Sequence, residues 1–207
     1  MIMSSNKPSK KTLELLYKYE VGGGKAYYDK KLSKFTWPGG ASGPTIAIGI
    51  DCGYYTQTEL AQIFSFYSEE QLKLVQQASG KKGTQGKEYT KTLRQAGLTV
   101  DWEKAENIFQ TFTWPKFTRL AEKAFPGLTE LHEDAYGAIV SLVFNRGTSM
   151  KGDSRKEMRN IRAYVPEQNY KKIAQQIREM KRIWIGKGLD GLLERRDAEA
   201  ILVESVA

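Results

Sequence analysis

Apolar residues near the start of the chain repeat with the period of an α-helix. Across residues 9–20 they fall on one helical stripe, and Ser9 stands where an N-cap residue is expected. Glycines at positions 22–24 follow, and consecutive glycines favour conformations that end a helix. The pattern predicts a helix over residues 9–20, with Glu20 in its last turn.

A different pattern follows this helix. Residues 25–35 alternate loosely between polar and apolar side chains, and residues 37–44 have the composition of a loop. Residues 45–50, with the sequence TIAIGI, alternate as a strand does. We therefore expect a small antiparallel sheet near the N-terminus, and we expect no other β-structure.

The remaining sequence predicts helices. Three pairs have the spacing of a capping box, in which a hydroxyl side chain and an acid or amide three residues later cap a helix start. These pairs are Thr56 with Glu59, Ser68 with Gln71, and Ser154 with Glu157. Helices are expected over residues 87–95, 101–112, 115–125 and 192–203.

Residues 129–144 form the most apolar of the expected helices. This segment leaves no broad polar face, and a helix that is apolar all round is buried. The sequence therefore predicts a mostly α, α+β fold with two lobes. After a tail over residues 1–8, we expect a single domain over residues 9–207. Its small lobe covers about 9–66 and its helical lobe about 67–207.

Composition narrows the class of protein. The chain has 207 residues, of which 40% are hydrophobic and 27% charged, as in a globular protein. Its single cysteine, Cys52, excludes an intrachain disulfide, and its single histidine, His132, has no partner at metal-ligand spacing. We expect neither a metal nor a cofactor.

The termini and the apolar runs bear on localisation. No apolar run approaches the ~20 residues of a membrane-spanning helix, and residues 1–11 lack the apolar core of a signal peptide. We expect a protein made in the cytoplasm without a signal peptide.

The formal net charge of +8 predicts an anionic partner. Nucleic acid, an acidic lipid surface and an acidic polymer all satisfy this condition, and charge alone does not choose among them.

Four polar residues near the N-terminus suggest glycosidase chemistry. Hydrolysis of a glycosidic bond uses one acid to protonate the leaving oxygen and a second that positions water or attacks the sugar. Glu20 and either Asp29 or Asp51 could supply the pair, and the hydroxyl of Thr45 could help to hold water. The negative end of a helix dipole disfavours an ionised carboxylate at Glu20, as a general acid requires. On spacing alone, the default interpretation is an ordinary surface glutamate and two structural aspartates.

Three ordered motifs resemble the phage-type lysozymes. The first is Glu20 followed by YYD at 27–29 and TIAIG at 45–49, which is similar to that family's active-site hairpin. The form PGGASG at 38–43 with IDCG at 50–53 looks closer to the pesticin-like branch of muramidases. The other two are the central segment AIVSLVFNRG and the C-terminal segment GLDGLLERRDAE.

The resemblance implies a muramidase that cleaves the β-1,4 bond between N-acetylmuramic acid and N-acetylglucosamine without metal and with inversion. Glu20 matches the general acid and Thr45 the hydroxyl that helps to place water. The second acid falls at Asp51 in the pesticin-like branch and at Asp29 in the phage type, and we favour Asp51. Ala47 and Ile50 depart from the family's usual glycine and its aromatic or histidine, which bears on substrate preference.

Substrate contacts are expected from side chains beside the hairpin and below the cleft. We assign them to Trp37 and Tyr28 near the hairpin, and to Asn145 and Arg146 at the end of the central helix. For Asn145 and Arg146, a role in capping that helix explains the sequence equally well. Arg195 and Arg196 are expected to pair with acids or to cover the core.

The expected partner is bacterial peptidoglycan, and we expect a monomer without a specific nucleic-acid partner. As an endolysin the protein would reach the cell wall after holin release. As a toxin it would be injected by a secretion system and paired with an immunity protein. A lytic transglycosylase and a non-catalytic wall-binding module are the alternative functions.

Overall fold

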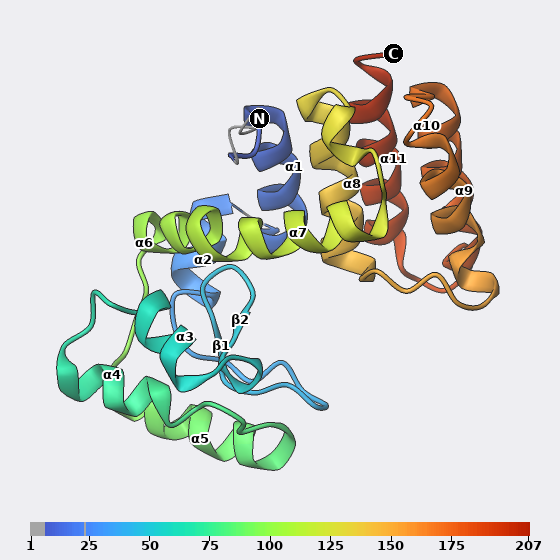
Figure 1. The fold of residues 1–207 in the computed structure, drawn as a ribbon. Helices are drawn as coiled ribbons and strands as arrows, with labels where there is room; N and C mark the ends of the chain where they lie inside the picture. The colour runs from blue at the N-terminus through green and yellow to red at the C-terminus, as the bar shows by residue number, and fades with distance from the viewer. Residues whose placement is uncertain (1–6, 23) are drawn as a thin grey trace. The chain divides into compact units, whose positions relative to one another are not determined.

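The computed structural model describes residues 7–22 and 24–207, which form two compact units. We call Met1–Tyr19 with Trp114–Ala207 the terminal unit, and Glu20–Thr113 the hairpin unit. The predicted class, mostly helical with a small two-stranded antiparallel sheet near the N-terminus, is confirmed (Figure 1). The units divide at residues 19/20 and 113/114. The lobe boundary expected near residue 66 stays a prediction.

Among its described residues, the hairpin unit contains five α-helices and a short π-helical segment. The α-helices are α2 Gly24–Lys31, α3 Gln57–Ile63, α4 Glu69–Gln76, α5 Gly83–Gln95 and α6 Trp102–Ile108, and the π-helical segment is Phe109–Thr113. Two of the predicted capping boxes are confirmed, because Thr56 caps α3 with Glu59, and Ser68 caps α4 with Gln71. Each box satisfies backbone N–H groups that would otherwise lack a partner at the helix start.

The sheet differs from its prediction. Residues 45–50, expected as one strand, contain most of a tight hairpin, in which β1 Thr45–Ile46 pairs with β2 Ile50–Asp51 around a turn at 47–49. Gly49 in this turn has φ of +78°, a conformation that glycine adopts without a steric penalty. An isolated bridge between Thr36 and Thr45 extends the pairing on the other side of β1.

The prediction of extended structure over residues 25–35 is also wrong for the first part of that range. Gly24–Lys31 is helix α2, and Lys25 pairs with Asp29 one turn later. Such a pair at i,i+4 supports a helix. The side chain of Tyr28 is fully buried and its hydroxyl donates a hydrogen bond to the carbonyl of Val100, so tertiary packing holds this polar helix in place.

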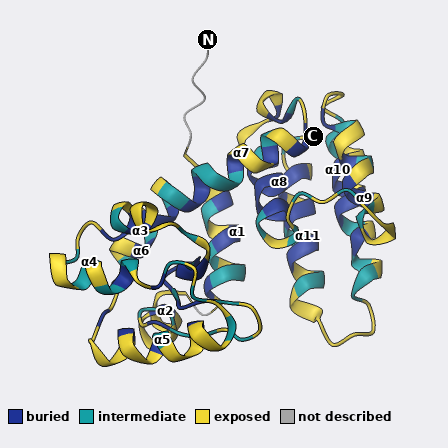
Figure 2. Ribbon diagram, turned by 60° about the horizontal axis from the view of Figure 1, so that its bottom comes forward, coloured by how far each residue is buried: buried dark blue, intermediate teal, exposed yellow. Residues whose placement is uncertain are grey.

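The terminal unit is built from helices. They are α1 Lys10–Val21, whose last two residues fall in the hairpin unit, α7 Trp114–Ala124, α8 Glu133–Arg146, α9 Lys156–Tyr164, α10 Tyr170–Glu179 and α11 Asp190–Glu204. Helix α8 confirms the predicted central helix, since most of its residues are buried (Figure 2). It begins at the N-cap His132, later than expected, and ends at Gly147. Ser9, predicted as the N-cap of the first helix, accepts a hydrogen bond from the backbone N–H of Thr12.

Buried charges join α8 to α11. Arg195, Arg196 and Glu199 of α11 are at most 3% exposed, and the Glu199 carboxylate accepts a hydrogen bond of 2.7 Å from the Ser141 hydroxyl of α8. Both arginines form ion pairs with Glu199. The prediction that these arginines pair with an acid is therefore confirmed.

The third predicted capping box is wrong. Ser154 lies in a 3₁₀ turn, and helix α9 begins after Arg155 without a side-chain cap. The Glu157 side chain is buried and binds Arg182 instead. A buried carboxylate without a cationic partner is costly, so the ion pair outweighs the local cap.

None of the helices in the described part of the chain has the length and apolar character that a membrane crossing requires.

Candidate active site

Glu20 occupies the predicted position in the last turn of α1. The helix ends at Val21, and Gly22 follows with φ of +69°, as the glycine run predicts. The Glu20 side chain is half-buried.

The hairpin register brings Thr45 and Asp51 together. Their Cα atoms are direct partners in the antiparallel pair. Directly opposite residues project their side chains to the same face, with Cβ atoms ~4.5–5.5 Å apart. The half-buried side chains of Thr45 and Asp51 therefore lie on the same face of the hairpin, and the Thr45 hydroxyl donates to the carbonyl of Gly43 at 3.2 Å.

Backbone amides orient the carboxylate of Asp51. The N–H of Gly43 donates to Oδ1 at 2.9 Å and to Oδ2 at 3.1 Å, and the N–H of Gly53 donates to Oδ1 at 3.0 Å. Asp51 also caps the 3₁₀ turn Cys52–Tyr54. An ionised carboxylate only accepts hydrogen bonds, so two amides aimed at it define its position.

Sequence reasoning missed the glycines that support Asp51. A Cβ on Gly43 or on Gly53 would lie 2.6 Å from the carbonyl oxygen of Lys81, and one on Gly86 would lie 2.8 Å from the carbonyl oxygen of Ser42. Only glycine permits these approaches. The recurrence of glycine around Asp51 is visible in the sequence. Its spacing does not predict that these glycines contact residues 81–86.

Asp29 stands on a separate element. It lies on α2 with its side chain exposed, 2.5 Å from the ammonium group of Lys25. Its backbone carbonyl accepts a hydrogen bond from the hydroxyl of Ser33. The structure places Asp29 on a helix, whereas Thr45 and Asp51 share a hairpin.

The two aromatic residues expected to contact substrate differ in exposure. Trp37 is half-buried, and its indole N–H donates to the carbonyl of Ser42 at 2.9 Å. Tyr28 is fully buried, and burial raises the pKa of its hydroxyl above the usual range for tyrosine. The Tyr28 ring therefore offers no surface to a substrate in this structure.

Asn145 and Arg146 end helix α8 in the terminal unit. Asn145 is exposed. The guanidinium of Arg146 donates to the carbonyl of Ser154 at 2.6 Å and lies 4.7 Å from the centre of the Trp184 ring. Burial, together with the neighbouring charges of Arg155 and Arg196, lowers the pKa of Arg146 to about 10.

Metal and thiol chemistry find no support in the described residues. Across residues 7–22 and 24–207, no three histidine, cysteine or acidic side chains are grouped to hold a metal ion. Cys52 is fully buried, and burial raises the pKa of its thiol well above the usual range. A buried thiol of high pKa is a poor nucleophile, so the structure favours a packing role for Cys52.

Comparison with known proteins gives the family. Residues 68–199, which include the central helix α8 and most of α11, match the model of the phage lysozyme family. The matched range begins after Glu20, Thr45 and Asp51, so it does not assign their roles. No curated protein matches the chain. Because the match covers more than half of its length, the chain belongs to the phage lysozyme family of glycoside hydrolases, whose substrate is peptidoglycan.

Proposed function

We propose that the protein is an N-acetylmuramidase that cleaves the β-1,4 bond between N-acetylmuramic acid and N-acetylglucosamine. Its membership of a family of peptidoglycan hydrolases supports the substrate class. The observation that carries the residue assignment is the pairing of Thr45 with Asp51 across the hairpin, because it sets a hydroxyl and a carboxylate on one face. The segment around Asp51 is also the one that looks closest to the pesticin-like branch.

In this proposal Glu20 is the general acid and Asp51 the general base. Glu20 protonates the glycosidic oxygen while the bond from that oxygen to the anomeric carbon breaks. A water molecule held by Thr45 and Asp51 attacks the anomeric carbon from the opposite face and gives its proton to Asp51. Attack from the opposite face inverts the configuration, which corresponds to carboxyl groups ~6.5–9.5 Å apart.

Asp29 is the second choice for the base, and its ion pair with Lys25 on an exposed helix argues for a structural role instead. For substrate contacts we retain Trp37, Asn145 and Arg146. Tyr28 is left out of this set because its ring is buried.

Replacement of Glu20 tests the assignment. Purified Glu20→Gln protein should release reducing ends from insoluble peptidoglycan about 10²–10⁴-fold more slowly than the parent, the usual contribution of a general acid. Glu14→Gln is the matched control, because Glu14 lies on the same helix with its side chain 66% exposed. An undiminished rate in Glu20→Gln would refute the role of Glu20.

The products separate hydrolysis from transglycosylation. Mass spectrometry of the released fragments should show ends that have gained one water, and NMR of early products should show the α-anomer. Anhydro-muramic ends would identify a lytic transglycosylase instead, which needs no water-placing acid.

The biological setting that we propose is lysis or killing of bacteria, as an endolysin or as an injected toxin. The genes beside the coding sequence test this. Holin genes support the first role, and genes for a secretion system and an immunity protein support the second.

A further inference from the structure

Basic residues concentrate around the N-terminal half of α5 in the hairpin unit. Residues 81–94 contain five basic side chains and one acidic side chain, a net charge of +4 out of +8 for the whole chain. Three of the five, Lys81, Lys82 and Lys87, we call the lysine cluster. No carboxylate within the described residues forms an ion pair with any of them.

An aromatic ring lies beneath each ammonium group of the lysine cluster. The Nζ atom of Lys82 is 3.6 Å from the centre of the Tyr54 ring, that of Lys87 is 5.5 Å from Trp37, and that of Lys81 is 5.1 Å from Tyr89. These separations are within the range of cation–π attraction. The rings therefore hold the three charges in place.

The rings are themselves fixed by hydrogen bonds to backbone carbonyls. The Tyr54 hydroxyl donates to Ala41 at 3.1 Å, the Trp37 indole donates to Ser42 at 2.9 Å, and the Tyr89 hydroxyl donates to Leu74 at 2.8 Å. A cationic surface whose side chains are already ordered loses less conformational entropy when it binds a ligand.

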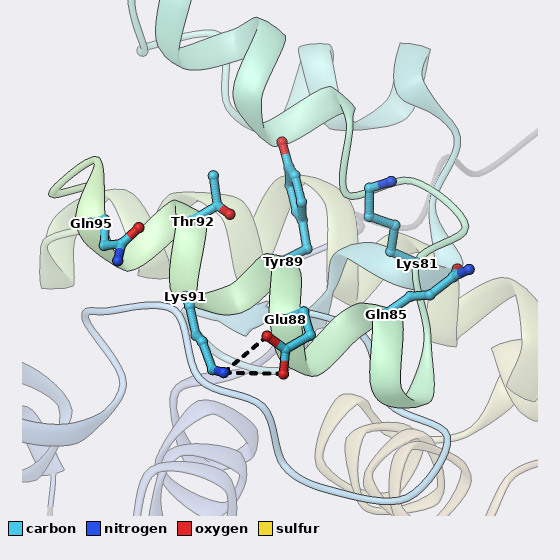
Figure 3. A pocket seen from close by; sticks show the side chains of 7 residues that line it. All are labelled: Lys81, Gln85, Glu88, Tyr89, Lys91, Thr92 and Gln95. Carbon is cyan, nitrogen blue, oxygen red and sulfur yellow. Dashed lines mark hydrogen bonds and ion pairs between the residues drawn. The ribbon is translucent and has the colours of Figure 1, made fainter.

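A groove adjoins the lysine cluster along α5 (Figure 3). Its volume is about 530 Å³, and it is open to solvent. Its lining consists of Lys81, Gln85, Glu88, Tyr89, Lys91, Thr92 and Gln95. Lys91 neutralises the one acid, Glu88, at 2.9 Å. The amides of Gln85 and Gln95 and the hydroxyl of Thr92 can both donate and accept hydrogen bonds, as the amide and hydroxyl groups of a glycan or peptide require.

This surface is attached to the hairpin that carries Asp51. The N–H of Gly83 donates to the carbonyl of Ser42 at 3.0 Å, and Gly86 packs against the backbone of Ser42 and Gly43. Gly43 in turn donates to Asp51. A ligand bound to the lysine cluster would therefore lie beside the same loop that positions the proposed catalytic base.

We propose that the lysine cluster and the α5 groove form a second binding surface for uncut peptidoglycan, with the stem-peptide carboxylates on the lysines and the neutral amides and hydroxyls in the groove. Charge complementarity carries the choice of an acidic polymer. Single-stranded nucleic acid fits less well, because it stacks its bases on open aromatic faces and each of these rings has a lysine over one face. The proposal rests on the peptidoglycan-hydrolase function.

Binding of an inactive protein tests the surface separately from catalysis. Full-length Glu20→Gln protein is sedimented with insoluble peptidoglycan that has been stripped of phosphodiester polymers. Adding Lys81→Gln, Lys82→Gln and Lys87→Gln should weaken binding about tenfold at ~50 mM salt, where charge interactions are little screened. The matched control, Lys30→Gln with Lys73→Gln and Lys123→Gln, removes three exposed lysines elsewhere and should change binding less than ~twofold.

Two further arms identify the ligand. Arginine at the three cluster positions keeps charge and cation–π contact, so it should keep binding, which separates lost charge from lost folding. Amidation of the stem carboxylates should weaken binding by the parent as much as loss of the lysines does. The proposal is overturned if the glutamine variant binds peptidoglycan like the parent, if the control variant loses as much binding, or if amidation has no effect. It is also overturned if a 20-nucleotide single strand displaces peptidoglycan at a lower concentration than soluble peptidoglycan fragments do. Because turnover is not measured here, a failed outcome leaves the hydrolase function standing.

Discussion

Ala47 holds a backbone conformation that alanine rarely adopts. It lies in the hairpin turn with φ of +57°, is 3% exposed, and its N–H donates to the carbonyl of Leu32 at 3.1 Å. A residue with a Cβ in this region of φ costs roughly 1–2 kcal/mol relative to the right-handed conformation. Alanine in place of the family's usual glycine therefore strains the turn.

Ala47→Gly should stabilise the protein by about 0.5 kcal/mol. Relief of the positive-φ strain exceeds the ~0.5–1 kcal/mol that glycine loses through the greater freedom of the unfolded chain. Ala26→Gly, in the exposed part of helix α2, is the control and should destabilise by about 1 kcal/mol. Thermal unfolding of the three proteins measures both effects, and a lower melting temperature for Ala47→Gly would contradict the expectation.

Substitution of the two candidate bases should affect rate and stability differently. Asp51→Asn should lower the rate on peptidoglycan by about 10²-fold or more and cost ~1 kcal/mol of stability, because Asp51 also caps a 3₁₀ turn. Asp29→Asn should leave the rate within ~twofold and cost less than ~0.5 kcal/mol, since it loses only an exposed ion pair. Reducing-end assays and thermal melts on both variants measure this. A loss of rate confined to Asp29→Asn would exchange the two roles.

At the scale of single residues, the sequence predicts which element carries Glu20 but not how Thr45 and Asp51 pair. Glu20 could be placed because a glycine run ends its helix. The pairing of Thr45 with Asp51 could not, because it depends on a turn whose first residue is an alanine in the left-handed region. Nothing in the local sequence predicts that conformation for an alanine. The alternating pattern of residues 45–50 therefore predicts one strand rather than a hairpin.

At the scale of elements, a long and continuously apolar segment predicts its helix well, and a short polar segment with weak periodicity does not. Helix α8 is apolar on every side and was found where predicted, apart from its first residues. Helix α2 is polar and short, and the burial of Tyr28 against Val100 and Trp102, which sequence spacing does not show, helps to explain why it forms. The prediction for Glu157 fails for a similar reason. Its ion pair with Arg182, which is distant in sequence, replaces the predicted local cap.

The contact between α5 and the hairpin gives a prediction at this scale. A Cβ on Gly86 would lie 2.8 Å from the Ser42 carbonyl and 2.9 Å from the Gly43 Cα, and both are backbone atoms that cannot rotate away. Gly86→Ala should therefore cost about 1–3 kcal/mol and should lower activity by displacing the loop that holds Asp51. Gly191→Ala is the matched control, because nothing lies within 4 Å of its Cβ, and it should be neutral or stabilising by up to ~1 kcal/mol.

Denaturant unfolding and the peptidoglycan assay together test this contact. If Gly86→Ala keeps both its stability and its rate, the close packing of α5 on the hairpin does not support the site. A loss of stability with an unchanged rate would leave the packing structural and remove its connection to Asp51.

At the scale of the whole molecule, the terminal unit is assembled from both ends of the described chain. Residues of α1 pack with residues 114–207, although about a hundred residues separate them in sequence. The approach of α1 to α8 requires a glycine, since a Cβ on Gly137 would lie 1.8 Å from the Thr12 hydroxyl oxygen. Asp134, near the start of α8, joins the same elements by accepting hydrogen bonds from Ser9 at 2.6 Å and Lys11 at 2.9 Å.

Asp134 should make this connection sensitive to acid. Burial by itself would raise the pKa of Asp134, but hydrogen bonds from Ser9 and Lys11 and the charge of Lys11 outweigh it and hold the pKa below the usual range. A carboxyl whose pKa is lowered by folding stabilises the folded state fully above its unfolded pKa, ~3.9, and that contribution is lost as the pH falls through the folded value. Asp134→Asn should therefore cost roughly 1–3 kcal/mol near neutral pH. Urea unfolding of parent and variant between pH 3 and 7 should show a stability difference that is constant above about pH 5 and shrinks below about pH 4. The control, Glu14→Gln on the exposed side of α1, should show no such change. A difference for Asp134→Asn that does not vary with pH would mean that its charge does not hold the two ends of the chain together.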